Sequence, residues 1–159
     1  MKGLKRTLAA LLLASTLSGC GYRDFRAQDD AVAAAWADVA HSYQERAQLV
    51  PQLLQALEGR GAAQPDTLTA ARAAQTAALT VDARPEALQN PQMFHAFQQV
   101  QGELSALLTQ LMTETADVPG ITQDAAFRQL NAQLHEIENS IIHARERYLY
   151  TVREFNKMT

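Results

Sequence analysis

The side chain with the most distinctive chemistry in this 159-residue chain belongs to its single cysteine, Cys20. A thiol can act as a nucleophile, a metal ligand, a disulfide partner or a point of covalent attachment. Three basic residues, Lys2, Lys5 and Arg6, precede it, and an uncharged apolar run over residues 8–17 follows them. A basic start, a short apolar run and small residues before a cleavage point indicate a secretory signal. Ten apolar residues span roughly 15 Å as a helix, about half of a bilayer core, so this run is too short to cross a membrane.

The residues Leu17-Ser18-Gly19-Cys20 resemble the lipobox of bacterial lipoproteins, in which the chain is cleaved before the cysteine and the thiol carries a diacylglycerol. The resemblance implies that residues 1–19 are a lipoprotein signal peptide, that Cys20 is the lipidation site and that residues 20–28 form a lipidated N-terminus and tether. Several acyl chains together anchor a protein stably in a membrane. In bacteria with two membranes, an Asp after the cysteine tends to keep a lipoprotein in the inner membrane, and Gly21 in that place favours the outer membrane, facing the periplasm. The alternative is an ordinary secretory signal with an incidental cysteine.

The remaining candidate ligands and catalytic groups form no recognisable constellation. A di-iron bundle places a Glu three residues before a His on two of its helices, and none of the four histidines has this spacing. The sequence also lacks a Cys-x-x-Cys-His haem motif, a glycine-rich phosphate loop and a nucleophile beside a base. We therefore predict no cofactor, no metal site and no catalytic residue, and we expect the histidines at the surface: His41, His95, His135 and His143.

The charge of the mature chain argues against nucleic acid as a partner. The full sequence has 14 Lys and Arg and 17 Asp and Glu. Cleavage before Cys20 would remove three of the basic residues and no acid, which leaves 11 basic against 17 acidic residues and a net charge of −6. Such a chain repels phosphate backbones and anionic lipid surfaces. Its size of about 140 residues is that of one domain.

Apolar periodicity predicts two helices in the first half of the chain. The first begins at Asp29, which can cap it, and ends at the glycines of residues 59–61. Pro51 lies inside this helix and is expected to kink it, because proline removes one backbone hydrogen bond. The second helix opens at Pro65 and runs to about Asp82, and residues 83–90 then form a connector.

Two more helices are predicted in the second half. Asn90 and Pro91 indicate a cap followed by proline at the first helical position, and this helix extends to Asp117. After a turn at residues 118–120, a fourth helix begins near Thr122. Its apolar residues recur at steps of three and four over more than thirty positions: Phe127, Leu130, Leu134, Ile137, Ile141, Ala144, Tyr148, Val152 and Phe155. Four amphipathic helices with short connections predict an all-α, antiparallel up-down-up-down four-helix bundle with long first and last helices.

Arg46 interrupts the apolar side of the first helix. It lies between Tyr43 and Val50, in the phase where an aliphatic residue is expected. In an antiparallel pairing of the first and last helices, Arg46 lies level with Glu138 and Asn139, so we expect its guanidinium to reach one of them. The first interpretation is a polar pair that sets the helix register. The second is a polar cluster that binds a ligand.

Two blocks of sequence are similar to the LemA family. The first helix has a tryptophan, Trp36, followed by the Arg-x-x-Leu-Val-Pro-x-Leu run of residues 46–53. The last helix has the Glu-Asn of residues 138–139, an Ala-Arg, an aromatic residue and the Val-Arg-Glu-Phe-Asn of residues 152–156. The resemblance implies a membrane-associated helical bundle of the cell envelope. The chain departs from many relatives in having a lipobox where they have a transmembrane helix.

Taken together, the sequence predicts a lipid-anchored, non-enzymatic interaction or scaffold module. Its partners would be the membrane, through the lipidated N-terminus, and an envelope protein. In an alternating bundle the loops at residues 59–64 and 118–120 lie at the end away from the membrane. The alternative is a periplasmic ligand-binding bundle or enzyme with its polar site around Arg46 and Glu138.

Overall fold

The computed structural model describes residues 2–157, and it places the side chains of residues 26–157 with the exception of Leu88. Its long helices are α1 (Lys2–Glu58), α2 (Pro65–Thr80), α4 (Pro91–Ala116) and α5 (Ala125–Asn156). Two short helical turns, α3 (Pro85–Leu88) and the 3-10 helix η1 (Ile121–Gln123), lie in the connections. None of the helices, within the part of the chain described, is long and apolar enough to cross a membrane.

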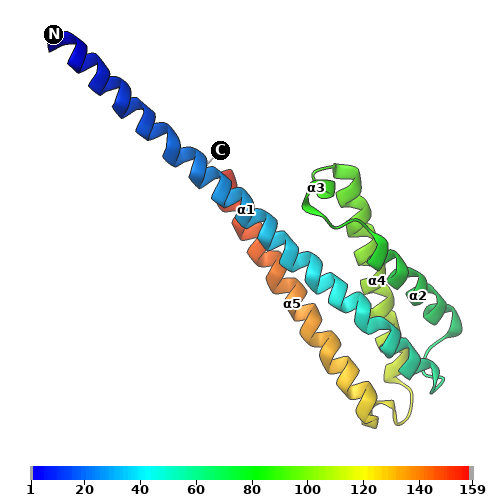
Figure 1. Ribbon diagram of the computed structural model, residues 1–159. Helices are drawn as coiled ribbons and strands as arrows, with labels where there is room; N and C mark the ends of the chain where they lie inside the picture. Colours follow the sequence, from blue (N-terminus) through cyan, green and yellow to red (C-terminus); the bar gives the residue numbers. More distant parts are fainter. Residues whose placement is uncertain (1, 158–159) are drawn as a thin grey trace.

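The four long helices alternate in direction and form a bundle (Figure 1). α1 packs along α5, and α2 packs against both α1 and α4. The loops at residues 59–64 and 117–124 lie at one end of the bundle, whereas α3 and the end of α5 lie at the other, where α1 projects beyond its neighbours (Figure 1). The predicted all-α, up-down-up-down bundle with long first and last helices is confirmed.

The expected start of the first helix at Asp29 is wrong, because α1 already runs from Lys2. Asp29 could cap a helix, but no proline precedes it, and a capping residue alone does not interrupt helical hydrogen bonding. α1 also continues through Pro51. The helix expected near Thr122 begins at Ala125, where Asp124 accepts a hydrogen bond from the Phe127 backbone N–H at 2.7 Å. At the start of α4, Asn90 accepts one from the Gln92 N–H at 2.9 Å.

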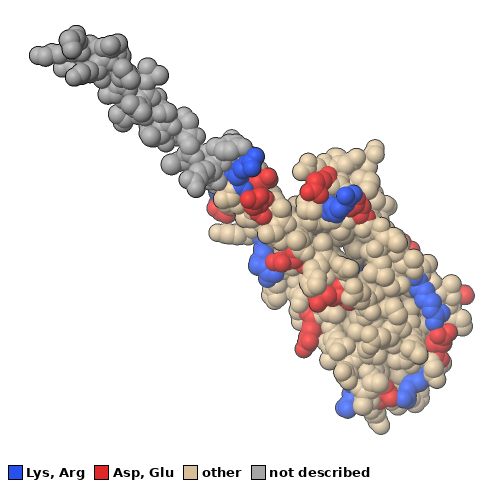
Figure 2. Space-filling model, in the orientation of Figure 1, with Lys and Arg blue, Asp and Glu red and all other residues tan. Residues whose placement is uncertain are grey.

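The core has two parts. Toward the loop end, leucines of α1 and α4 pack with α2 and α5; the most deeply buried include Leu53, Leu54, Leu57, Leu104 and Leu111. At the opposite end, Trp36, Val39, Phe97 and Ala144 form a smaller cluster to which Tyr43, Phe94 and Tyr148 add. The charged residues that Figure 2 shows are scattered over the visible face and do not gather into one patch.

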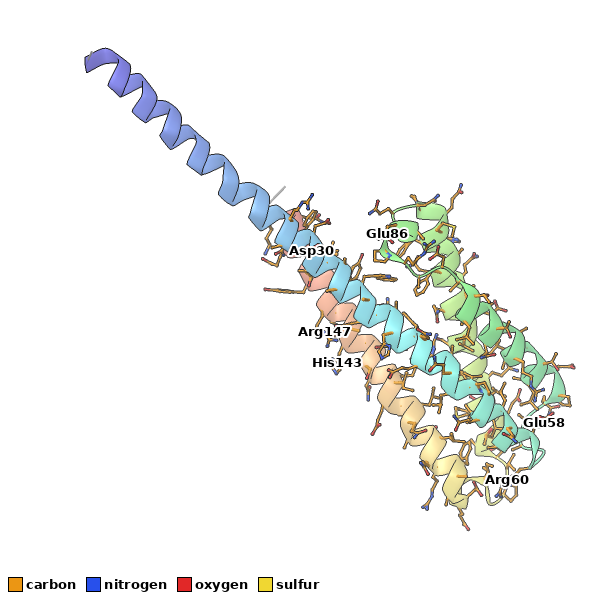
Figure 3. All side chains as sticks on the ribbon, viewed as in Figure 1. Asp30, Glu58, Arg60, Glu86, His143 and Arg147 are labelled. Carbon is orange, nitrogen blue, oxygen red and sulfur yellow. The ribbon has the colours of Figure 1, made fainter. Side chains whose placement is uncertain are left out.

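The loop end is fixed by a helix cap and by ion pairs. The N–H of Gly61 donates to the Glu58 carbonyl at 3.0 Å and the N–H of Ala62 to the Leu57 carbonyl at 3.0 Å, which together close the end of α1. Arg72 of α2 pairs with Glu58 at 2.5 Å, and Arg60 pairs with the capping Asp124. Figure 3 shows Glu58 and Arg60 together at this end of the bundle.

Replacement by alanine is expected to change the free energy of unfolding in opposite directions at two glycines. Gly61 has a φ of +58°, so Gly61→Ala is expected to lower the free energy of unfolding by about 1 kcal/mol. Gly102 lies within α4, and an added Cβ would meet no atom within 4 Å, so Gly102→Ala should raise it by about 0.5 to 1 kcal/mol. Urea unfolding of both variants beside the parent chain measures the two shifts. Equal signs would contradict this assignment of the glycines.

Candidate functional site

Arg46 lies where the two parts of the core meet. Its side chain is 1% exposed, with Ala47 and Val50 of the larger core on one side and Tyr43 of the aromatic cluster on the other. A guanidinium cannot be deprotonated in a protein, so its charge is buried and must find partners here. The surrounding helices supply them.

The guanidinium connects α1 to α4 and α5 through four hydrogen bonds. Nη2 donates to the backbone carbonyl of Gln101 at 3.0 Å and to its side-chain oxygen at 2.9 Å. Nη1 donates to Ser105 Oγ at 2.5 Å and to Glu138 Oε1 at 3.1 Å. The guanidinium also lies 5.1 Å from the centre of the Tyr43 ring. This planar fork of donors holds the three helices in one register.

Of the two partners expected for Arg46, Glu138 makes the contact and Asn139 does not. Asn139 is exposed, and no hydrogen bond joins it to Arg46 among the described residues. Adjacent helical residues point about 100° apart, so a chain that turns Glu138 toward α1 turns Asn139 toward solvent. Glu138 itself is 37% exposed, so its other oxygen remains hydrated. A ligand-binding role for Arg46 and Glu138, in addition to setting the helix register, stays a prediction.

Gln101 and Ser105 are the members of this network that sequence reasoning missed. The signal for Gln101 was present, because it lies between Phe97 and Leu104 on the buried side of α4, as Arg46 does on α1. A glutamine on an apolar stripe indicates a buried polar partner. Ser105 gave no such signal, since serine is common on exposed helix faces; its hydroxyl also donates to the Gln101 carbonyl at 3.0 Å.

One polar atom of the network has no partner. Arg46 Nε is buried and makes no hydrogen bond, and it is the one such side-chain atom among the described residues. The other guanidinium hydrogens are used within the bundle, and Arg46 does not line the neighbouring cleft. The polar pair is therefore closed to solvent on the Arg46 side.

A cleft opens beside this network, between α1, α4 and α5. Its volume is about 320 Å³, and it is partly open to solvent. Aromatic rings line much of it, and Gln98, Gln101 and Ser105 add polar groups. Gly102 and Leu149 line it on the α4 and α5 sides, and the exposed Arg145 lines it as well. The five rings come from three helices: Trp36, Tyr43, Phe94, Phe97 and Tyr148.

Trp36 holds the aromatic end together. Its ring centre lies 5.4 Å from that of Phe97 and 5.1 Å from that of Tyr148, both edge to face. Its Nε1–H donates to the carbonyl of Ala83 at 2.7 Å. The connector that presents Ala83 is fixed by Asp82, which accepts hydrogen bonds from Arg84; the Arg84 guanidinium lowers the pKa of Asp82 to about 2.

The histidines lie at the surface, as expected. All four are exposed, and in residues 26–157 no group of three His, Cys, Asp or Glu side chains is placed to hold a metal ion. His143 and Arg147 lie along the outer side of α5 (Figure 3), where Arg147 pairs with Asp38 of α1 at 3.6 Å. The side chain of Cys20 lies outside the described residues, so its lipidation stays a prediction.

Glu114 joins the α1–α2 loop to α4. It accepts hydrogen bonds from the Gln64 backbone N–H at 3.0 Å, from Thr67 Oγ1 at 2.8 Å and from Gln110 Nε2 at 2.9 Å. These donors, the Gln64 N–H first, lower the pKa of the Glu114 carboxyl. A carboxyl whose pKa is lower in the folded than in the unfolded chain stabilises the fold above the unfolded pKa and loses that effect as the pH falls.

Acid should therefore weaken this corner of the bundle. Between about pH 5 and pH 3 the unfolded chain takes up the Glu114 proton before the folded chain does, so the stability falls. Glu114→Gln is expected to be less stable at pH 7 and to lose less stability over that interval. Urea midpoints at several pH values measure this, with Glu103→Gln, an exposed position on the same helix, as control. Parallel pH profiles for the parent chain and Glu114→Gln would rule the effect out.

Comparison with known protein families assigns the chain to one of them. Comparison with curated proteins finds no match. The profile of the LemA family matches residues 35–159, which contain Trp36, the Arg46 network, the aromatic cleft and the whole of α5. Because the match covers most of the sequence, the chain belongs to the LemA family.

Proposed function

We propose that this LemA-family chain is a lipid-anchored protein of the bacterial envelope that acts as a non-enzymatic interaction module. Cys20 carries the lipid and the bundle contacts an envelope protein. The observation that carries the non-enzymatic part is the closure of the Arg46 network. Its four donated hydrogen bonds all end on the chain itself, and its side chain is 1% exposed, so this buried charge organises helices and is not offered to a substrate.

The geometry of the bundle supports a contact surface at the loop end. The loops at residues 59–64 and 117–124 lie at the end opposite the projecting part of α1 (Figure 1). They are held by the Arg60–Asp124 pair, the Arg72–Glu58 pair and the hydrogen bonds of Glu114. A fixed surface loses little conformational freedom on binding, which favours association. With the lipid at Cys20, this end faces away from the membrane.

The alternative, a ligand site at Arg46 and Glu138 themselves, has less support. That site would need an opening lined by both residues, and the cleft next to them is lined by neither. The same closure speaks against an enzyme whose chemistry uses Arg46. The outer membrane, with the bundle facing the periplasm, remains the proposed location on the strength of Gly21.

The anchor is tested by metabolic labelling with a palmitate analogue. The parent chain is expected to take up label and to sediment with membranes, and Cys20→Ala is expected to lose the label. Label on Cys20→Ala would show that Cys20 is not the lipidation site. The absence of label on both chains would contradict the lipid anchor.

The interaction role is tested by crosslinking in living cells followed by recovery from membranes. The parent chain is compared with a Cys20→Ala form held by a substitute transmembrane helix. Recovery of the same envelope protein with both forms would support a module that the lipid only locates. Recovery of a partner with neither form would contradict the interaction role.

A further inference from the structure

The cleft beside the Arg46 network has the size and lining of a small-molecule site. At about 320 Å³ it lies at the lower end of the range for ligand pockets, which are mostly apolar with a few polar groups that orient the ligand. We propose that it binds a small amphipathic organic anion: an aromatic or branched apolar body that ends in a carboxylate. This ligand is additional to the protein partner proposed above and independent of it.

The apolar walls favour an aromatic body. The Trp36 ring meets those of Phe97 and Tyr148 edge to face, at 5.4 and 5.1 Å between ring centres, and all three rings line the cleft. Phe94 adds a fourth ring, 6.4 Å from Trp36. A ligand ring in the cleft would contact the half-buried rings of Phe94 and Tyr148 and would displace water from their apolar surface.

The charge of the cleft lining favours an anionic ligand. Arg145 is the one charged residue that lines the cleft in the described part of the chain, and no acidic side chain lines it. No ion pair or hydrogen bond of the Arg145 side chain is present there, although Arg147, two residues further on, is paired with Asp38. An unpaired guanidinium beside apolar walls fits a carboxylate, which it can bind through two parallel hydrogen bonds.

Gly102 keeps the cleft open from the α4 side. It lies within α4, where glycine costs stability relative to alanine, and an added Cβ would meet no atom within 4 Å. No packing inside the chain therefore requires a glycine at this position. The absence of its side chain leaves space in the cleft, so a larger residue would fill the cleft without disturbing the helix.

The test uses the chain's own fluorescence. Trp36 is the only tryptophan in the sequence, and it lines the cleft. The full chain in phosphatidylcholine vesicles is titrated with 4-phenylbutyrate, and with 4-phenylbutanol and 4-phenylbutylamine, which share its apolar body but are neutral and cationic. Empty vesicles give the blank. We expect a saturable change in Trp36 emission that is strongest for the carboxylate and weakest for the amine.

Three variants separate the parts of the proposal. Arg145→Gln should weaken binding of the carboxylate about fivefold and leave binding of the alcohol unchanged. Arg153→Gln removes an exposed arginine of the same helix outside the cleft and should change neither. Gly102→Leu should abolish saturable binding while the melting temperature stays at or above that of the parent chain.

Three results would overturn the proposal. The first is the absence of any saturable change with 4-phenylbutyrate. The second is binding that survives Gly102→Leu in a folded chain. The third is binding that is equal for the carboxylate and the amine and that Arg145→Gln does not change. None of these results bears on the crosslinking test of the protein partner, so the two proposals fail separately.

Discussion

Replacement of Arg46 by alanine is expected to lower the free energy of unfolding by about 3 to 5 kcal/mol. The substitution removes four hydrogen bonds and leaves a void between α1, α4 and α5. It also leaves the buried side-chain oxygen of Gln101 without its donor, which costs more than the bond itself was worth. Urea unfolding followed by circular dichroism measures the loss.

Two further variants separate charge from volume at this position. Arg46→Met keeps most of the volume and is expected to cost less than Arg46→Ala, because Glu138 is 37% exposed and can be hydrated when its partner is gone. Glu138→Gln leaves the Arg46 charge buried without a carboxylate and should be destabilising on its own. The double variant Arg46→Met with Glu138→Gln should recover part of that loss. A cost below about 1 kcal/mol for Arg46→Ala would show that the network does not hold the bundle.

Replacement of Trp36 by alanine should cost about 3 to 5 kcal/mol, the usual range for a buried large aromatic residue. The indole contacts rings from α4 and α5, and its N–H is bonded to the α2–α3 connector, so its loss loosens three elements at once. The expected readout is a lower melting temperature with early loss of the aromatic signal in near-ultraviolet circular dichroism.

Trp36→Phe is the matched variant, because it retains an aromatic ring and loses the hydrogen bond to Ala83. We expect a cost of about 1 to 2 kcal/mol, which combines the unpaired Ala83 carbonyl with a smaller ring. If Trp36→Ala were no worse than Trp36→Phe, the ring contacts would contribute nothing and the aromatic end would have to be held by other means.

Much of the fold could be predicted from local signals. Asn90 and Pro91 placed the start of α4 because a capping side chain and a fixed proline φ both favour a helix there. The long periodic stripe gave α5, with its start misplaced by the 3-10 turn at Ile121–Gln123. The beginning of α1 was mispredicted because a residue that can cap a helix, such as Asp29, need not begin one. No proline precedes Asp29, and α1 continues through Gly19 and Gly21.

The candidate site was predicted less completely, for a geometric reason. The phase of Arg46 on α1 and the antiparallel register were enough to expect Glu138. They could not choose between Glu138 and Asn139, because that choice depends on the rotation of α5 about its own axis. The cleft depends on how far α4 and α5 stand apart and on one glycine, Gly102, and no periodicity in the sequence reports the distance between helices.

The continuity of α1 determines how the bundle would be carried above a membrane. If the lipid is attached at Cys20, the segment from there to Trp36 is part of one helix and acts as a rod. With a rise of about 1.5 Å per residue, its roughly 16 residues set the aromatic end about 24 Å from the lipid. A flexible linker of the same number of residues would let the bundle move freely toward and away from the membrane surface. A rod keeps the bundle on a shell at one distance from its lipid, so a partner would have to present its binding surface at that distance from the attachment point.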